Sequence, residues 1–289
     1  MEGVVSNLRS PFLALLAALS AGPSVDVSGS WKTLTRGQIK RWVSSAAEDV
    51  EQYYGRFPAP EARISVESAT GSRGIHGRTF GGRFIRVSLD EEASAADLRA
   101  DWVMVHEMVH LSFPDLGDGY GWMEEGLATY LEPIIQARAG RLTEADFWQG
   151  VVQGMPKGLP REGDRGLDHT HTWGRTYWGG ALYWLHCDVA IREATGNRRS
   201  LDDVLRAILE RGGDGAHTWT IEKVFVTAKK ATGLDTLRTL HLKYGQQPEG
   251  SNLAELWKRM GVVVADGRVS FDDGAPLASI RKSITRASR

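Results

Sequence analysis

The sequence of 289 residues contains a single cysteine, Cys187. One cysteine cannot form a disulfide within the chain, and it cannot supply a Cys-x-x-Cys metal site. The 35 basic and 36 acidic residues give a formal net charge of −1. No excess of positive charge therefore favours a nucleic acid or an anionic membrane, and we expect no nucleic-acid partner. Hydrophobic residues make up 42% of the chain, which is ordinary for a globular protein with a sizeable core.

The apolar run at residues 11–19 is too short to cross a bilayer as a helix, so we expect no stable membrane span. This run follows an arginine and precedes small residues, as the core of a secretory signal does, although Glu2 weakens the charged region before it. The alternative interpretations of this run are a buried helix and the remnant of a missing N-terminal domain. The compartment, cytoplasmic or exported, stays open.

What the sequence does contain is an HExxH motif, formed by His106, Glu107 and His110 within the segment WVMVHEMVH. Four residues along a helix turn through about 400°, so both histidines project from nearly the same face. Two imidazoles at that spacing can share one Zn²⁺, and Glu107 can reach a metal-bound water without ligating the metal. A motif with only three fixed residues also occurs by chance. The alternative is that both histidines are ordinary polar residues on a surface helix.

The residues before the motif predict where its helix begins. A capping box at residues 94–97 marks a helix start. An apolar stripe at helical spacing follows: Leu98, Trp102, Val105 and Val109. We therefore expect one helix from about residue 94, buried along this stripe.

A catalytic zinc site needs a third protein ligand and an open fourth position. The HExxHxxGxxH pattern would need glycine at 113 and histidine at 116, where this chain has Phe113 and Leu116. The class of zinc site in which a third histidine is the ligand is therefore excluded. The segment GWMEEGLATYLE, residues 121–132, offers Glu124 and Glu125 on a second predicted helix. A carboxylate-ligand site therefore remains.

The segment W-x-x-E-G-x-A at residues 122–128 resembles that of the aminopeptidase N and glycyl aminopeptidase families, which are gluzincin metallopeptidases. In those families the glutamate before the glycine is the third zinc ligand, which the resemblance places on Glu125 and not on Glu124. The segment Y-x-x-G-A at residues 177–181 is similar to theirs as well, and implies that Tyr177 steadies the tetrahedral intermediate. Residues 182–205 look most like the glycyl aminopeptidase family. The resemblance covers roughly residues 35–262.

The resemblance implies an α+β fold of the thermolysin-like type, with a small β-sheet followed by a mostly helical part. It implies a catalytic domain over residues 31–262, whose β-containing part ends near residue 92. The apolar segment, residues 1–30, precedes it. A C-terminal hairpin on the turn Asp266-Gly267 and a basic tail, residues 263–289, follow it.

The implied activity is hydrolysis of peptide bonds in a peptide or protein substrate. One Zn²⁺ per chain would be held by His106, His110 and Glu125, with Glu107 as general base and Tyr177 as oxyanion donor. Aminopeptidase N relatives carry a G-x-M-E-N segment that grips the substrate's free amine. No such segment precedes the motif here, so aminopeptidase and endopeptidase activities both stay open. A catalytically silent binding or scaffold protein is the alternative, and the intact motif argues against it.

Two further side chains have weaker predictions. Glu132 lies seven residues past Glu125 on the same helix face, so it is a candidate acceptor for a ligand histidine's other N–H, or a solvated carboxylate. His171 lies in a long loop, residues 155–172, and is a candidate substrate contact, or simply solvated.

The remaining pattern gives expectations about individual elements. Residues 71–82 are rich in glycine and predict a flexible turn or a hairpin. Residues 83–89 predict a strand, which is our candidate for the sheet edge that binds an extended substrate, with an ordinary strand of the sheet as the alternative. Pro133 is expected to interrupt its helix, and the basic tail from Arg281 is expected to be frayed.

Overall fold

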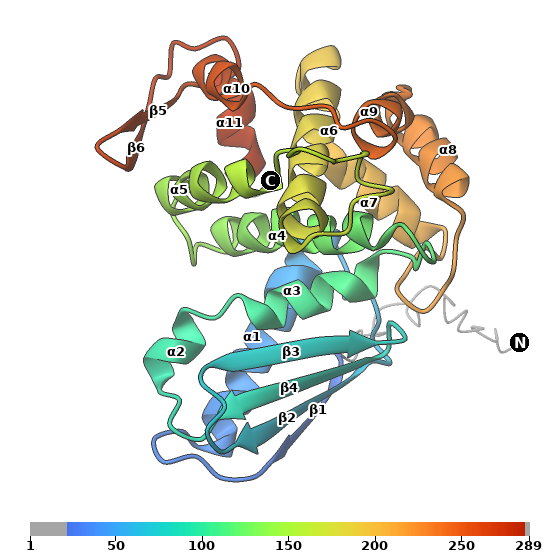
Figure 1. Cartoon of the computed structure of the whole chain (residues 1–289). Coiled ribbons are helices and arrows are strands. Elements are labelled where there is room, and N and C mark those ends of the chain that lie inside the picture. Colours follow the sequence, from blue (N-terminus) through green and yellow to red (C-terminus); the bar gives the residue numbers. More distant parts are fainter. Residues whose placement is uncertain (1–21, 287–289) are drawn as a thin grey trace, which may run out of the picture.

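The computed structural model describes residues 22–286 and has a small sheet followed by a largely helical part (Figure 1). This α+β arrangement confirms the fold class predicted from the sequence. The apolar run at residues 11–19 lies outside the described residues. Within residues 22–286, no helix is both long enough and apolar enough to span a membrane.

The sheet has four strands in the order β1-β2-β4-β3. Their bounds are Ser24–Ser28 for β1, Arg63–Ala69 for β2, Ile75–Phe80 for β3 and Phe84–Asp90 for β4. Strand β2 pairs in parallel with β1 on one side and with β4 on the other, and β3 runs antiparallel to β4. Alternate residues of the two inner strands are fully buried, and these are Ile64, Val66, Ile85, Val87 and Leu89. They belong to one core with helix α1, Arg36–Tyr54, which lies behind the sheet in Figure 1.

The strand order corrects the prediction of which strand is the edge. Residues 83–89 fall in β4, which is flanked on both sides, so they do not form the edge of the sheet. The edge strand β3 comes instead from the glycine-rich stretch, for which we expected a flexible turn or a hairpin, and it forms a hairpin with β4. Gly77 allows this strand to lie against the motif helix, because a Cβ there would be 2.6 Å from Cγ of Glu107.

The motif helix, α3, spans Val103–Val109 and begins later than predicted. The capping box at residues 94–97 forms, but it starts a separate short helix, α2, Ala95–Arg99. The start of α3 is held by Asp101, whose carboxylate accepts hydrogen bonds from the backbone N–H groups of Val103 and Met104 at 2.9 and 3.0 Å. The stripe prediction was wrong for Trp102, which is 54% exposed.

The helical part is built around α4, Gly121–Arg138, which packs against α3 on one side and α6 on the other. Gly126 lets α4 approach α6 closely, since a Cβ there would lie 2.4 Å from the backbone of Gly180. The other elements are α5 Glu144–Gly154, α6 Gly180–Ala194, α7 Leu201–Glu210, α8 Ile221–Thr232, α9 Thr236–Leu240, α10 Leu253–Met260, β5 Val262–Ala265, β6 Arg268–Phe271 and α11 Ala278–Thr285.

Two further expectations were wrong. Pro133 does not interrupt α4, because its neighbours Leu131 and Ile134 are buried in the core and hold the helix together despite the missing N–H. Residues 281–285 are not frayed but belong to α11. The Arg281 side chain is 1% exposed, with its guanidinium 2.8 Å from the carboxylate of Glu144.

Candidate metal centre

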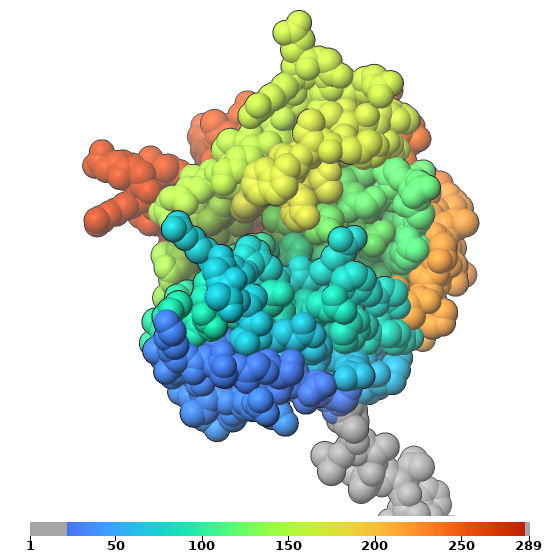
Figure 2. Space-filling view, turned by 60° about the horizontal axis from the view of Figure 1, so that its bottom comes forward, coloured from blue at the N-terminus to red at the C-terminus, as the bar shows by residue number. Residues whose placement is uncertain are grey.

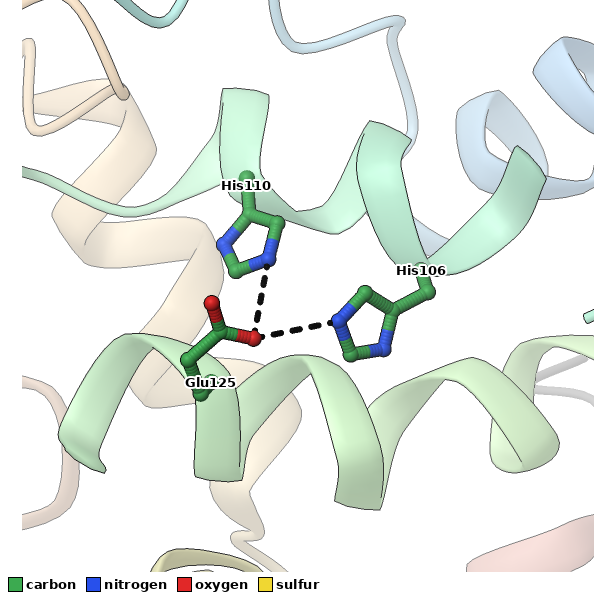
Figure 3. Close-up of side chains that lie close together, drawn as sticks. All are labelled: His106, His110 and Glu125. Carbon is green, nitrogen blue, oxygen red and sulfur yellow. Dashed lines mark hydrogen bonds and ion pairs between the residues drawn. The ribbon is translucent and has the colours of Figure 1, made fainter. Parts of the chain in front are cut away.

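Three metal-ligating side chains meet between α3 and α4 (Figure 3). His106 lies in α3, and His110 begins the 3₁₀ turn His110–Ser112 that continues it. Glu125 faces both histidines from the first turns of α4. Its Oε2 atom lies 3.3 Å from Nε2 of His106 and 3.5 Å from Nε2 of His110. The three ligand atoms are all within 4.8 Å of one another.

The separations of 3.3 and 3.5 Å from Oε2 of Glu125 to the two imidazole nitrogens fit a tetrahedral zinc ion. Ligands at about 2.0–2.1 Å from Zn²⁺ lie about 3.3–3.4 Å from one another at the corners of a tetrahedron. Two imidazole nitrogens and one carboxylate oxygen are also the donor set of catalytic zinc sites, which keep the fourth position open. The residues present therefore fit a catalytic Zn²⁺.

The charge of Glu125 is consistent with this assignment. Burial alone would raise the pKa of Glu125, but hydrogen bonds from His106 and His110 outweigh it and hold the pKa well below its ordinary range. Burial alone would lower the pKa of His110, but the neighbouring Glu125 carboxylate outweighs it and raises the pKa. Glu125 is therefore an ionised carboxylate, as a metal ligand must be.

The neighbouring Glu124 does not join the cluster. Its Oε1 atom accepts a hydrogen bond of 3.4 Å from the backbone N–H of Leu116. Burial raises the pKa of Glu124 to about 7. The geometry thus favours Glu125, the residue that the family resemblance implied.

Glu107 lies beside the cluster and is held by the edge strand. The hydroxyl of Thr79 donates to Oε2 of Glu107 at 2.7 Å and also lies 2.9 Å from its backbone oxygen. The sequence analysis missed Thr79, because no spacing rule links residues 79 and 107. The available signal is the alternation along β3, which turns Ile75, Gly77 and Thr79 to the same side as the buried residues of β4.

Tyr177 stands next to the cluster on an irregular backbone. It lies in the π-helical turn Arg175–Gly179 that leads into α6, a feature often found at functional sites. Its ring is nearly parallel to that of His106, with centroids 6.3 Å apart. Burial, followed by the negative charge of Glu125, raises the pKa of Tyr177 above 10. The hydroxyl group therefore stays protonated, and able to donate, at neutral pH.

The structure places the two weaker candidates away from the cluster's ligand atoms. Among the described residues, the hydrogen-bond donor to Glu132 is Gln136, one turn further along α4. Burial raises the pKa of Glu132 to about 8. His171 is exposed in the loop before Tyr177 and does not line the cleft over the cluster. Roles for Glu132 beside a ligand histidine and for His171 in substrate binding stay predictions.

A cleft of about 660 Å³ opens over the cluster, and its lining comes from β3, α3, α4 and Tyr177. The space-filling view shows the surface hollowed where the sheet part meets the helical part (Figure 2). Gly215, in the loop between α7 and α8, lies against one end of the cleft. Its N–H donates to the backbone oxygen of Leu111 at 3.2 Å, and a Cβ there would lie 2.3 Å from the backbone oxygen of His110.

The sheet, the motif helix and the following helices form a fold that is similar to that of solved M1 zinc metallopeptidases, as the sequence resemblance implied. An aminopeptidase N family protein from Idiomarina loihiensis is similar with a TM-score of 0.65 and 14% identity, over 83% of this chain and 47% of that one. An M1 zinc metallopeptidase from Deinococcus radiodurans is similar with a TM-score of 0.50 and 17% identity, over 78% and 49%.

A mutant of the Deinococcus radiodurans enzyme bound to a Tyr-Ser-Ala substrate has the same TM-score of 0.50, with 16% identity over 76% of this chain and 47% of that one. The chain thus spans about half the length of the solved structures that it matches. No protein-family model matches the sequence, and no curated protein matches it.

Proposed function

We propose that this chain is a zinc-dependent metallopeptidase that holds Zn²⁺ through His106, His110 and Glu125. The observation that carries the proposal is the meeting of these three ligand atoms, within 4.8 Å of one another, beside an oriented Glu107. A binding or scaffold protein would have no use for a buried glutamate held by a dedicated hydrogen bond. The peptidase function is therefore the better explanation of the site.

The edge strand β3 supplies the means of holding an extended peptide. Among residues 22–286, β4 is the one neighbour of β3 in the sheet, so only one side of β3 is paired within this part of the chain. Residues 75–79 line the cleft, so their free backbone groups can bind a peptide as an added strand. Such binding places a backbone carbonyl of the peptide over the metal centre without any requirement for a particular side chain.

The side chains around the cluster have separate roles in the hydrolysis. A bound Zn²⁺ supplies Lewis acidity, which polarises the scissile carbonyl and acidifies the attacking water. Glu107, oriented by Thr79, accepts a proton from that water as the C–O bond forms, and delivers it to the leaving nitrogen as the C–N bond breaks. Tyr177 donates its hydroxyl hydrogen to the developing oxyanion. An aminopeptidase and an endopeptidase would both use this machinery.

Metal content of purified variants tests the ligand assignment. We expect about one zinc per chain in the wild type and a loss of most of it in Glu125→Ala, because three-ligand sites tolerate no missing ligand. Glu124→Ala is the matched control, one residue away on the same helix, and should keep its zinc. Circular dichroism shows whether each variant is folded. Zinc retained by Glu125→Ala and lost by Glu124→Ala would overturn the assignment.

A further inference from the structure

The position of Tyr177 beside the metal centre depends on the backbone that carries it. Its side chain lines the open cleft and is only partly buried, so the packing around its ring is incomplete. One of its ring contacts, Trp173, is itself 61% exposed. The turn Arg175–Gly179 is π-helical, which is a rare conformation in proteins. The contacts that hold this turn therefore determine where the Tyr177 hydroxyl group lies.

A buried ion pair holds the first residue of the turn. Arg175 is 5% exposed, and its Nε and Nη2 atoms lie 2.8 and 3.4 Å from the two carboxylate oxygens of Asp164. Its Nη1 atom donates a hydrogen bond to the backbone oxygen of Gly158. The side chain of Asp164 is 3% exposed and also accepts a hydrogen bond of 2.8 Å from the N–H of Gly166. Each partner of the ion pair is thus fixed by a further contact of its own.

The loop before Tyr177 also contacts both ends of the turn through its backbone. At the start of the turn, a Cβ on Gly174 would lie 2.4 Å from the backbone oxygen of Lys157. At its end, a Cβ on Gly158 would lie 2.3 Å from the backbone nitrogen of Gly179. The turn therefore lies against this loop on both sides of Tyr177, with no room for a side chain between the two segments.

The same loop is joined to the helix that carries the metal ligand Glu125. The Asp168 carboxylate accepts hydrogen bonds from Nε1 of Trp122 at 3.0 Å and from Nε2 of His241 at 2.9 Å. Trp122 lies in the first turn of α4, three residues before Glu125. Residues 164–168 therefore connect the turn that carries Tyr177 with the helix that carries a ligand of the metal.

We infer that Asp164 and Arg175 are positioning residues that hold the Tyr177 hydroxyl group at its place beside the metal ligands. The inference rests on the proposed function, because an effect on rate supposes that Tyr177 acts on a bound peptide. Neither Asp164 nor Arg175 lines the cleft, so the pair acts through Tyr177 and not by touching the substrate. Buried ion pairs add little to stability, because removing two charges from water offsets their attraction. Holding one arrangement of the turn is the role that the contacts of this pair support.

Two substitutions weaken the ion pair in different ways. Asp164→Asn removes the negative charge and keeps an oxygen acceptor of similar shape. Arg175→Lys keeps the buried positive charge, but an ammonium group lacks the planar fork that contacts Asp164 and Gly158 together. If Asp164→Asn does not fold, Arg175→Lys provides the test, because it leaves no charge without a partner.

Asp202→Asn is the matched control. It breaks another buried ion pair, in which Oδ2 of Asp202 lies 2.7 Å from Nη1 of Arg138, and neither of these residues lines the cleft. Both Asp→Asn changes leave a buried guanidinium without its counter-charge, so a loss of stability is common to them. Circular dichroism and zinc content show that each variant is folded and loaded with metal.

The kinetic measurement is a double-mutant cycle with Tyr177→Phe in zinc-loaded protein. Asp164→Asn and Arg175→Lys should each lower kcat roughly 10–100-fold with KM nearly unchanged, because small displacements of a reacting group are costly. In the Tyr177→Phe background the same changes should lower kcat less than about threefold, since no hydroxyl group is left to position. Asp202→Asn should leave kcat near its starting value in both backgrounds. An unchanged kcat in the single variants, or equal losses in both backgrounds, would overturn the inference.

Fluorine NMR separates this inference from the proposed function, because it needs no activity. Protein labelled with fluorotyrosine has seven labelled rings, and the Tyr177 signal is the one that Tyr177→Phe removes. Asp164→Asn and Arg175→Lys should shift that signal towards the position of free fluorotyrosine, and Asp202→Asn should leave it in place. This result in a protein that cleaves no peptide would leave the positioning role standing and sink the peptidase proposal alone. An unchanged Tyr177 signal in both variants would overturn the positioning role.

Discussion

At the scale of single residues, the site combines one local pattern with contacts that no local pattern encodes. The i, i+4 spacing of His106 and His110 predicted their shared face, and the structure brings their Nε2 atoms to the same carboxylate oxygen. Glu124 and Glu125 could be separated only through the family resemblance, because both lie on the same helix turn. Thr79 could not be predicted, because its contact with Glu107 depends on the pairing of distant elements.

Removing the Tyr177 hydroxyl tests whether this side chain acts on the reaction. Tyr177→Phe should lower kcat and kcat/KM by similar factors, roughly 10²–10³, with KM nearly unchanged, because an oxyanion gains more from a donor than a neutral carbonyl does. Steady-state peptide hydrolysis measures this. Tyr120→Phe, at a tyrosine outside the cleft, is the control. Activity of Tyr177→Phe within about threefold of the wild type would show that Tyr177 only packs against His106 and Trp173.

At the scale of elements, the sequence predicted helix starts and turns best where the interactions that form them join residues close together in the chain. The capping box at residues 94–97 and the hairpin turn at Asp266-Gly267 form as expected. The errors lie where tertiary packing decides. The glycine-rich edge strand is held by pairing with β4 and by close contact with α3. Helix α4 continues past Pro133 because the residues on either side of the proline are buried in the core.

The buried carboxyl group of Glu132 makes the stability of α4 and its surroundings depend on pH. Its pKa is about 8 in the folded protein against an ordinary value of 4.5, so the folded state binds a proton that the unfolded state releases. This stabilisation is complete below about pH 4.5 and is lost as pH rises to about 8, by at most about 1.4 kcal/mol per pH unit.

Glu132→Gln keeps the shape of the side chain and removes this titration. The free energy of unfolding of the metal-free wild type should therefore fall relative to that of Glu132→Gln between pH 5 and pH 8, and the difference should level off above pH 8. Urea unfolding at four pH values measures it, with Glu210→Gln at the exposed end of α7 as the control. Parallel pH profiles for the wild type and Glu132→Gln would contradict the raised pKa.

At the scale of the whole molecule, the α+β order of the chain was predictable, but the position of the cleft was not. The cleft forms where the edge of the sheet meets the helical part, and it needs β3, whose position at the edge of the sheet was not predicted. The loop that carries Gly215 reaches the end of this cleft from between α7 and α8, more than a hundred residues after His110. Such contacts follow from the complete fold and have no signature in any one segment.

Hydrolysis of a mixed peptide library tests the central claim most directly. Zinc-loaded wild type and Glu107→Gln are incubated with the library, and the cut positions are mapped by mass spectrometry. We predict that the wild type cleaves peptides and that chelation of the metal abolishes cleavage. Glu107→Gln should keep its zinc and fold but lose several orders of magnitude in rate, because it has no group to accept the proton from water. Cleavage by Glu107→Gln at a rate near that of the wild type, or no cleavage by the zinc-loaded wild type, would contradict the account.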